Sequence, residues 1–514
     1  KFKQSGLTVA INSPVISAIQ TAQHMGKAAS DTSDPRMKAL AAANIAFAGK
    51  NAADAIKAGQ GTTINGKDNQ IPTKVDADGK VTESRDTNAA DKAGGINLSI
   101  SIGGSKSESK TVQTSDSARG STVAAGNNLN ITATGAGPNS DITAQGSTLQ
   151  AGNRVALNAQ DEIKLLAAKN TADQHSTNKS QSGSIGISIG TDGFLFTASA
   201  SGARGNADGS DVTWTNTHVN AGNQVAMTSG GDTTVTGAVV QAPQITANVG
   251  GNLNVESLQD TSKFDSKQQS IGGSISIGYG KMGGSFSASK SKVDSDFASV
   301  AEQSGFRAGD EGFNVNVANN TDLKGGGITS TQKAIDDNKN NFSTGGTLTT
   351  SDIQNQANYR ASSVGVNIGT GASLDGKLAP QGTSAGFGKD SGNASSTTTA
   401  AISGIAGNND ARTGDQEKGI AKIFDTETTQ KEINAQVTIT REFSAQTGKS
   451  INDYVTNQRK VLQEQLKNAN TLEDKALAEQ AIKDVNMQER ALNILVGALT
   501  GMAGTVVTKE ALST

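Results

Sequence analysis

One pattern of alternating apolar and small polar residues recurs five times in this 514-residue chain and limits what the chain can fold into. Its clearest copy covers residues 182–201, SGSIGISIGTDGFLFTASAS, with a Gly-centred turn at 191–193. Alternation with a period of two is typical of a β-hairpin with one apolar face, here opposite a face of uncharged Gly, Ser and Thr. The predicted apolar face of this copy consists of Ile185, Ile187, Ile189, Phe194 and Phe196.

The five copies are spaced almost evenly along the chain. They begin at Leu7, Leu98, Ile185, Ile275 and Val364. A spacing of about 90 residues that holds over five copies predicts a repeat array. In the fourth copy the predicted apolar face consists of Ile275, Ile277, Tyr279 and Phe286.

A second, shorter motif lies between the hairpins and ends in Gly-Asn. It occurs at 126–127, 152–153 and 222–223, with a degenerate copy at 250–252, and a short strand follows each copy. The separation of the first two copies suits one coil of a parallel β-helix. We expect Gly-Asn to form the corner of each coil, because both residues tolerate the left-handed conformation. The hairpins are then either insertions between coils or strand pairs that project from them.

The composition favours a long thin core over several globular domains. Apolar residues make up 34% of the chain and aromatic residues 3%, whereas Gly numbers 60. A solenoid can bury so few apolar residues if they recur at regular intervals. The net charge of −3 gives no indication of nucleic acid or of an acidic membrane surface as the main partner. The chain has no Cys, which suits a protein that crosses an envelope unfolded.

The sequence divides into five segments that differ in composition. From Asp34-Pro35 and Ser13-Pro14 we expect two helices in the first segment, since each pair provides an N-cap followed by Pro. In the last segment we expect helices at about 427–446 and 451–467, separated at Gly448, and a third that runs into the apolar stretch 491–507. The predicted segments are 1–60, a first strand and a helical hairpin; 61–93, a polar connector; 94–372, a β region of repeats with inserted hairpins; 373–420, a Gly/Ser/Thr-rich linker; and 421–514, a helical segment.

Three stretches carry a resemblance to a known family. Residues 249–260 (VGGNLNVESLQD), 320–325 (NTDLKG) and 347–355 (TLTTSDIQN) resemble the haemagglutinin repeats of large exoproteins of two-partner secretion. More narrowly, they resemble the second filamentous-haemagglutinin repeat region of CdiA-type contact-dependent growth inhibition exoproteins. Residues 421–514 resemble the start of the pretoxin domain that follows this region. The family's VENN motif does not occur in the sequence, so no toxin activity is assigned to it.

The resemblance implies a function in contact-dependent growth inhibition. Members of the family are secreted to the bacterial surface through a partner outer-membrane transporter, bind a receptor on a neighbouring cell and deliver a C-terminal toxin. The second repeat region is held to enter the outer membrane of the target cell and to pass the toxin through it. The implied partners are therefore the target-cell outer membrane, the chain's own toxin domain and the transporter. A haemagglutinin-type adhesin or a passive β-helical stalk is the alternative function.

The residues themselves are compatible with a membrane role and leave a second structure open. Outer-membrane strands alternate a lipid-facing apolar side with a small or polar side, and about 9–11 residues suffice to span the bilayer. The hairpins at 182–201 and 272–289 have that pattern. Alternatively, the hairpins form an extra-helical sheet that packs against the coils or against each other. Both arrangements can hold at different times, so we expect a mainly β fold of parallel β-helix coils with protruding antiparallel hairpins as candidate transmembrane β-barrel strands, plus helices near both ends.

No pattern for catalysis is present in the sequence. The three histidines, His24, His175 and His218, do not have the spacing of metal ligands. Neither a nucleophile elbow nor a phosphate-binding loop occurs. We therefore expect a non-enzymatic protein without a catalytic, cofactor-binding or metal site. The single Trp, Trp214, is expected to be a packing residue or to lie at the base of a hairpin, and stacking on a ligand is the alternative.

Overall fold

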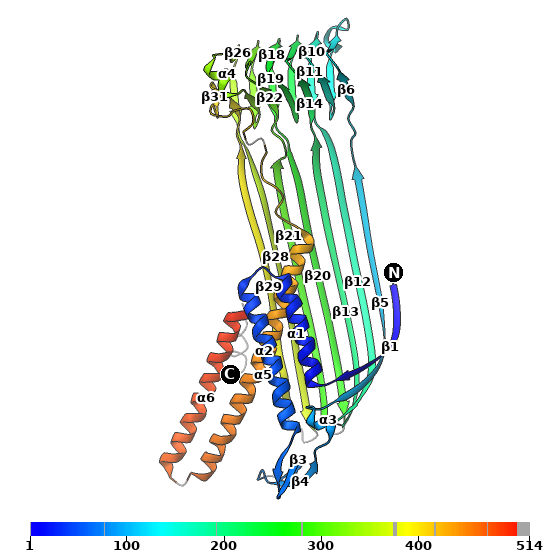
Figure 1. Ribbon diagram of the computed structural model, residues 1–514, viewed down its shortest axis with the longest axis vertical. Coiled ribbons are helices and arrows are strands. Elements are labelled where there is room, and N and C mark those ends of the chain that lie inside the picture. The colour runs from blue at the N-terminus through cyan, green and yellow to red at the C-terminus, as the bar shows by residue number, and fades with distance from the viewer. Residues whose placement is uncertain are drawn as a thin grey trace.

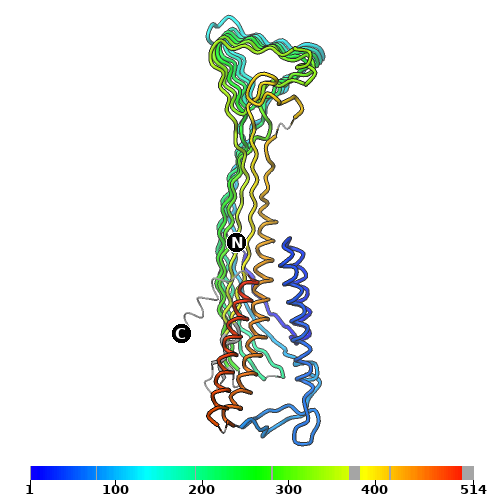
Figure 2. Tube along the Cα trace, turned by 90° about the vertical axis from the view of Figure 1, so that its left-hand side faces the viewer, coloured from blue at the N-terminus to red at the C-terminus, as the bar shows by residue number. Residues whose placement is uncertain are grey.

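The molecule combines a three-sided parallel β-helix with a long antiparallel sheet (Figure 1). The computed structural model describes residues 2–76, 78–191, 193–278, 281–373, 378–415, 418–469 and 471–500. Figure 2 looks down the axis of the β-helix, so that its coils superimpose. It shows that the sheet leaves the β-helix at one corner and that helices lie on one face of the sheet. The mainly β architecture of coils, hairpins and helices that the repeats predict is confirmed.

Three sheets form the sides of the β-helix. The first contains β7 (Asn128–Ala133), β10 (Arg154–Ala159), β15 (Gln224–Ser229), β18 (Gln244–Val249), β23 (Phe313–Val317) and β26 (Asn341–Thr344). The second contains β8 (Ile142–Gln145), β11 (Ile163–Leu166), β16 (Thr233–Thr236), β19 (Leu253–Glu256), β24 (Thr321–Lys324) and β27 (Leu348–Ser351). The third contains β6 (Thr122–Ala125), β9 (Thr148–Ala151), β14 (Thr217–Ala221), β17 (Ala238–Ala242), β22 (Gly305–Ala308), β25 (Gly327–Thr329), β30 (Ala401–Ile402) and β31 (Ala406–Gly407). All strand pairs in these sheets are parallel except the terminal β30–β31 pair.

Apolar side chains stack from coil to coil to form the core of the β-helix. Val155 pairs with Val225, and Val225 pairs with Ile245, so that one column continues through the first sheet to Phe313. Val155, Val225 and Ile245 are fully buried and Phe313 almost so. Each strand contributes two or three inward residues, which explains how a chain with few apolar residues holds a continuous core.

The Gly-Asn corners exist, but their conformation differs from the prediction. None of Gly126, Gly152 and Gly222 has a positive φ. They are glycines because they stack closely: a Cβ on Gly152 would lie 2.2 Å from the carbonyl oxygen of Gly126, and one on Gly222 would lie 2.1 Å from that of Gly152. The following residues form an amide ladder, in which Asn223 Nδ2 donates to Asn153 Oδ1 at 2.6 Å.

The degenerate fourth copy, 250–252, belongs to another corner. It lies between β18 and β19, where the Gly251 N–H donates to the carbonyl oxygen of Gly231 at 2.9 Å. Asn252 N–H likewise donates to Asp232 Oδ1 at 2.6 Å. The sequence resemblance to the other three copies therefore reflects the same stacking constraint at a different side of the coil.

The long sheet has eight antiparallel strands in the order β1-β5-β12-β13-β20-β21-β28-β29. Three hairpins supply six of them, and each hairpin leaves the coil at the corner between the second and third sheets. The hairpins therefore project from the coils. The strands are β1 (Phe2–Asn12), β5 (Asn97–Asp116), β12 (Ala168–Gly190), β13 (Gly193–Thr215), β20 (Gln259–Gly278), β21 (Lys281–Val300), β28 (Ile353–Ser373) and β29 (Leu378–Thr398).

Two predictions about this sheet are wrong. The arms of the hairpin that contains residues 182–201 have 23 residues each, about twice the length expected, because their coil-proximal halves are polar on both faces and show no apolar alternation. The segment 373–420, expected to be a linker, contains β29, which pairs with β28 along its length, and β30 and β31, which close the end of the β-helix. Small residues are compatible with this strand because a helix, α5 (Thr426–Asn468), packs directly over it and needs the space that they leave.

The helices gather on one face of the long sheet. The helical hairpin α1 (Pro14–Asp31) and α2 (Pro35–Gly59) packs on α5 (Thr426–Asn468), and α6 (Leu472–Thr500) runs back along α5. Both predicted N-caps are confirmed, since the side chains of Ser13 and Asp34 accept from the N–H groups of Ile16 and Arg36. The remaining elements are β2 (Thr62–Ile64), β3 (Lys67–Val75), β4 (Val81–Asp86), α3 (Ala89–Lys92), η1 (Gly137–Asn139) and α4 (Gln332–Asp336).

Helix α5 is continuous, whereas the sequence predicted a break at Gly448. A glycine inside a helix costs only about 1 kcal/mol, and the packing of α5 before and after Gly448 offsets this cost. Phe443 is buried against the helical hairpin, and Val455 is buried on the half that faces α6. Part of the third predicted helix, residues 501–507, lies outside the described residues.

Helix α5 lies directly on glycines of the last two strands. A Cβ on Gly386 would lie 2.3 Å from the carbonyl oxygen of Val437, and one on Gly388 would lie 2.2 Å from that of Ile433. Glu432 of the same helix joins the helical hairpin, because its carboxylate accepts from the Thr32 hydroxyl at 2.5 Å and from the Ser33 N–H at 2.7 Å. The helical layer is thus fixed to this face of the sheet from both ends of the chain.

The corner geometry makes a stability prediction. Gly152→Ala should lower the free energy of unfolding by about 1–3 kcal/mol, the usual cost of an extra methyl group in a packed site, because the methyl meets the carbonyl oxygen of Gly126. Gly126→Ala is the matched control at the same corner, since nothing lies within 4 Å of its added Cβ. Thermal unfolding followed by circular dichroism measures both. Equal melting temperatures of the two variants would contradict the stacking explanation.

Candidate functional site: the exposed apolar face of the long sheet

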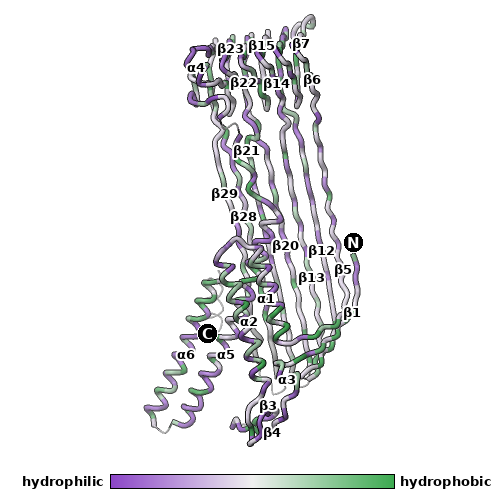
Figure 3. The backbone as a smooth tube through the Cα atoms, in the orientation of Figure 1, coloured by the Kyte–Doolittle hydropathy of each residue, from purple (hydrophilic) through white to green (hydrophobic). Residues whose placement is uncertain are grey.

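The register of the long sheet brings the five alternating copies together. Ile187 of β12 lies opposite Ile100 of β5 on one side and opposite Phe196 of β13 on the other. Phe196 in turn lies opposite Ile277 of β20. Residues opposite each other in a sheet share a face. The apolar residues of all the copies therefore form one surface at the free end of the sheet, which Figure 3 shows as the hydrophobic part of these strands.

This surface is exposed. The described candidate residues have exposed fractions between 42% and 60%. They are Ile185, Ile187, Ile189, Phe194, Phe196, Ile275, Ile277 and Phe286. Tyr279, the ninth candidate, lies outside the described residues. Side chains from the other strands extend the surface and are exposed as well: Leu7, Val9, Ile11, Leu98, Ile100, Ile102, Ile271, Met282, Val366 and Ile368. We call these eighteen residues the apolar face.

A continuous apolar surface of this kind is unusual for a protein in water. Exposed apolar residues are normally scattered, and contiguous patches of more than a few hundred Å² mark interaction or membrane sites. Sequence reasoning singled out residues from two hairpins. It did not place the residues from β1, β5 and β28 on the same surface, although all five copies show the alternation. The reason is that a sequence alone does not show which residues of distant strands lie opposite each other.

The opposite face of the same strands carries small residues. Ser184 lies opposite Ser199, with the two hydroxyl oxygens 2.8 Å apart, and Ser274 lies opposite Ser285 at 2.6 Å. A Cβ on Gly186 would lie 2.8 Å from the Cβ of Ser101, so the strands fit closely on this side. The helical layer lies on this face of the sheet, and no helix or strand of the described residues covers the apolar face on the other side (Figure 2).

The uncharged length of each strand is close to the thickness of a membrane. Runs without charge extend from the free end of the sheet towards the first Lys or Arg of each strand. These runs are 97–105 in β5, 180–190 in β12, 193–203 in β13 and 268–278 in β20, whereas in β21 the run 282–289 begins after Lys281. A tilted transmembrane strand needs about 9–11 residues. The sheet therefore carries the two features of outer-membrane strands, which are an apolar side and a small polar side of bilayer length.

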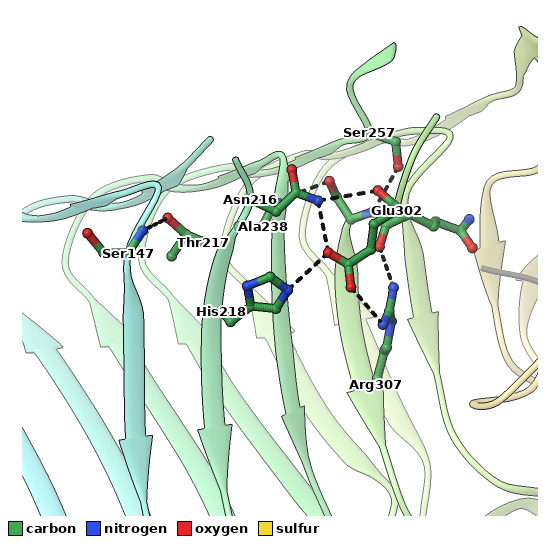
Figure 4. Close-up of polar contacts among 10 residues, drawn as sticks. Ser147, Asn216, Thr217, His218, Ala238, Ser257, Glu302 and Arg307 are labelled. Atoms are coloured by element: carbon green, nitrogen blue, oxygen red, sulfur yellow. Dashed lines mark hydrogen bonds and ion pairs between the residues drawn. The ribbon is translucent and has the colours of Figure 1, made fainter. Parts of the chain in front are cut away.

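Polar contacts hold the hairpins at the corner of the β-helix (Figure 4). His218 of β14 contacts Glu302, which lies between β21 and β22, with Nε2 and Oε2 3.0 Å apart. Asn216 Nδ2 donates to the same carboxylate at 3.1 Å, and Arg307 forms an ion pair with its other oxygen at 3.4 Å. The hydrogen bond to Glu302 raises the pKa of His218. These contacts join the base of the β12–β13 hairpin to the base of the β20–β21 hairpin.

Trp214 lies at the base of its hairpin, as predicted. It is opposite Lys169 in the β12–β13 pair. Its indole N–H donates to the carbonyl oxygen of Gln259 at 3.1 Å, and its backbone N–H donates to Asp260 Oδ1 at 2.9 Å. Burial raises the pKa of Asp260. The aromatic ring therefore fixes two neighbouring hairpins to each other.

The residues with metal-binding or catalytic potential do not converge. Within the described ranges no three His, Asp or Glu side chains are placed to hold a metal ion. His24 is on α1, His175 pairs with Asp208 in the middle of the sheet, and His218 is at the corner. In the helices that the structure describes, no stretch is both long and apolar enough to cross a membrane. The apolar face remains the feature that most needs a functional explanation.

Comparisons with known proteins agree with the resemblance. Residues 102–271 match the family model described as "Hemagglutinin repeat". The chain is 37% identical over 469 residues to "Toxin CdiA" of Escherichia coli, covering 85% of the chain and 14% of that relative. It is 36% identical over 414 residues to "Deoxyribonuclease CdiA" of Dickeya dadantii (78% and 11%) and 34% identical over 440 residues to "Deoxyribonuclease CdiA" of Yersinia pseudotuberculosis (84% and 37%). The chain thus spans a small part of each relative, and the matched region is a repeat segment.

The His218–Glu302 pair predicts a pH dependence of stability. A raised pKa in the folded state means that protonated His218 stabilises the fold below its unfolded pKa, near the usual value of 6.5, and that this contribution is lost as the pH rises through the folded pKa. Because the imidazole is about one third exposed, solvent screening limits the effect to about 0.5–1 kcal/mol. His218→Gln should therefore destabilise the protein more at pH 5.5 than at pH 8, as measured by urea unfolding. The same loss at both pH values would show that the pair does not titrate as described.

Proposed function

Because the chain belongs to the CdiA-type, filamentous-haemagglutinin-like exoproteins, we propose that it is a non-enzymatic module that helps carry a C-terminal toxin across the outer membrane of a neighbouring cell. In this proposal the protein is secreted to the bacterial surface through a partner transporter. The long sheet then enters the outer membrane of the target cell during contact-dependent growth inhibition. The toxin is a further part of the exoprotein.

The observation that carries the proposal is the apolar face. Its side chains come from seven strands, share one side of the sheet and are exposed, whereas the opposite side has Ser and Gly. Lipid requires an apolar outer side, and a water-filled passage suits small polar residues on the inner side. A passive stalk needs neither an exposed apolar side nor an opposite side of small polar residues. Soluble proteins normally cover such a surface.

Burial of the apolar face alone does not decide whether the sheet enters lipid. At roughly 0.5 kcal/mol per apolar side chain at the membrane centre, the eighteen residues of the apolar face contribute about 9 kcal/mol. Each unpaired backbone group in hydrocarbon costs several kcal/mol, and a free strand edge has a row of such groups. The free edges of β1 and β29 must therefore become paired in the membrane. Eight strands are the smallest number found in outer-membrane barrels, so closure of one sheet edge on the other is sufficient.

The helical layer lies over the face that would line such a passage. Helix α5 rests on the glycines of β28 and β29, next to one of the two edges that must pair. The proposal therefore implies that α5 and the helical hairpin leave the sheet when the strands enter the membrane.

A charged residue on the apolar face should block this function. The double variant Ile187→Arg/Ile277→Arg should lose leakage of vesicles made from outer-membrane lipids and should lose toxin delivery. Each Arg at the midplane of a lipid-facing strand costs about 2–4 kcal/mol, which corresponds to a loss of insertion of about 30-fold or more per residue. Both positions are about half exposed in the folded protein, so secretion and the melting temperature should change little.

The matched control is Thr114→Arg. Thr114 is an exposed residue on the same side of the sheet, but it lies in the polar half near the coils, opposite Asp173. This variant should leak vesicles and deliver toxin like the parent protein. Normal delivery by the double variant would remove the basis of the proposal. Saturable binding to target cells that survives the double substitution would favour the adhesin.

A further inference from the structure

A band of basic residues borders the apolar face on the side towards the coils. Cross-strand register places its members in three adjacent rows on the same side of the sheet as Ile185 and Ile187. All of them are exposed. They are Lys3, Lys106, Lys110, Lys179, Arg204, Lys267, Lys290, Lys292 and Lys389. Among the described residues of these three rows, Glu108 is the one acidic side chain. We call these nine residues the basic band.

The band places like charges directly opposite each other. Lys3 lies opposite Lys106, Lys179 opposite Arg204, and Lys267 opposite Lys292. Like charges at directly opposed positions destabilise a sheet. Three such pairs in one band destabilise the sheet by charge repulsion, and a bound anionic partner would remove this repulsion. The protein's own carboxylates do not fully do so, because ion pairs within the described chain reach Lys267 and Lys292 but not Lys106, Lys179, Arg204 or Lys290.

Towards the coils, a row with three adjacent carboxylates ends the band. Asp208, Asp265 and Asp294 lie opposite one another in this row, which we call the acidic row, and His175 and Arg360 flank them. Rows on one face of a sheet are about 7 Å apart. The positive zone is therefore a narrow strip, with apolar side chains on one side and carboxylates on the other. A membrane has the same order, with hydrocarbon, then headgroups, then water.

We propose that the basic band binds the phosphate groups of an anionic lipid surface when the apolar face enters the membrane. This inference rests on the proposed function and adds the class of lipid that the sheet recognises. The band lies where the uncharged runs of the strands end, so bound headgroups also fix how deeply the sheet inserts. A nucleic acid fits less well, because its charged backbone would not cover the adjoining apolar side chains and the acidic row would repel it.

Vesicle binding of the whole chain tests the inference. The triple variant Lys179→Glu/Arg204→Glu/Lys290→Glu is compared with the parent on phosphatidylcholine vesicles with and without phosphatidylglycerol. Each basic residue near an anionic surface strengthens binding about 5-fold, so the triple variant should bind anionic vesicles at least about 100-fold more weakly. Its binding to pure phosphatidylcholine should not change. The parent's preference for anionic vesicles should also fall as salt is raised.

The control has the same change in charge away from the sheet. Lys449→Glu/Lys460→Glu/Lys475→Glu alters exposed positions of α5 and α6, and it should bind both kinds of vesicle like the parent. Circular dichroism verifies that both triple variants fold; if the band variant does not, Lys179→Gln/Arg204→Gln takes its place, with about 25-fold weaker binding expected.

Three results would overturn the inference in distinguishable ways. Parental binding of the band variant to anionic vesicles would refute the band while leaving the proposed function intact. If the parent binds neither kind of vesicle, the proposed function fails and the inference fails with it. If a DNA duplex displaces the parent from anionic vesicles and its own binding depends on the band, the partner is a nucleic acid.

Discussion

Backbone pairing across the eight long strands is the constraint on which the rest of the structure depends. Three hairpins leave the β-helix at the same corner. The strands of the first two stay in register for at least twenty residues, and those of the third do so up to one shift between Ile368 and Thr370 near the free end. A shift of one residue in any of them would turn its apolar side to the opposite face. Coils that stack at a fixed corner supply the alignment. The evenly spaced copies of the sequence pattern thus lie side by side and form a single surface.

The two faces of the sheet then acquire different roles. On one face, Gly and Ser let α5 approach the backbone of β28 and β29, and Glu432 ties that helix to the N-terminal helical hairpin. On the other face, an apolar zone, a basic band and an acidic row follow one another from the free end towards the coils. The order of these zones matches the layers of a membrane in contact with water. The β-helix and the polar half of the sheet would remain outside the membrane as a rigid support.

Much of this fold could be predicted from the sequence, since its signals are local. The alternation at Ile185–Ile189 predicts strands with one apolar side, and Ser13-Pro14 and Asp34-Pro35 predict helix starts that the structure confirms. The length of the arms could not be predicted, because the polar halves of β12 and β13 have no apolar side. Strand β29 was also hidden, because its small residues are covered by a helix from elsewhere in the chain. The close stacking of Gly152 on Gly126 and the shared register of the copies depend on distant residues, so local patterns do not reveal them.

The central claim, that one side of these strands faces lipid, is tested most directly by residue-by-residue labelling of one strand. The chain has no cysteine, so single cysteines at positions 184 to 189 of β12 can each carry an environment-sensitive dye. With vesicles of outer-membrane lipids, the account predicts a blue-shifted emission, quenched by a quencher dissolved in the lipid, at 185, 187 and 189 but not at 184, 186 and 188. Equal signals at all six positions, or no response to vesicles at any of them, would contradict it.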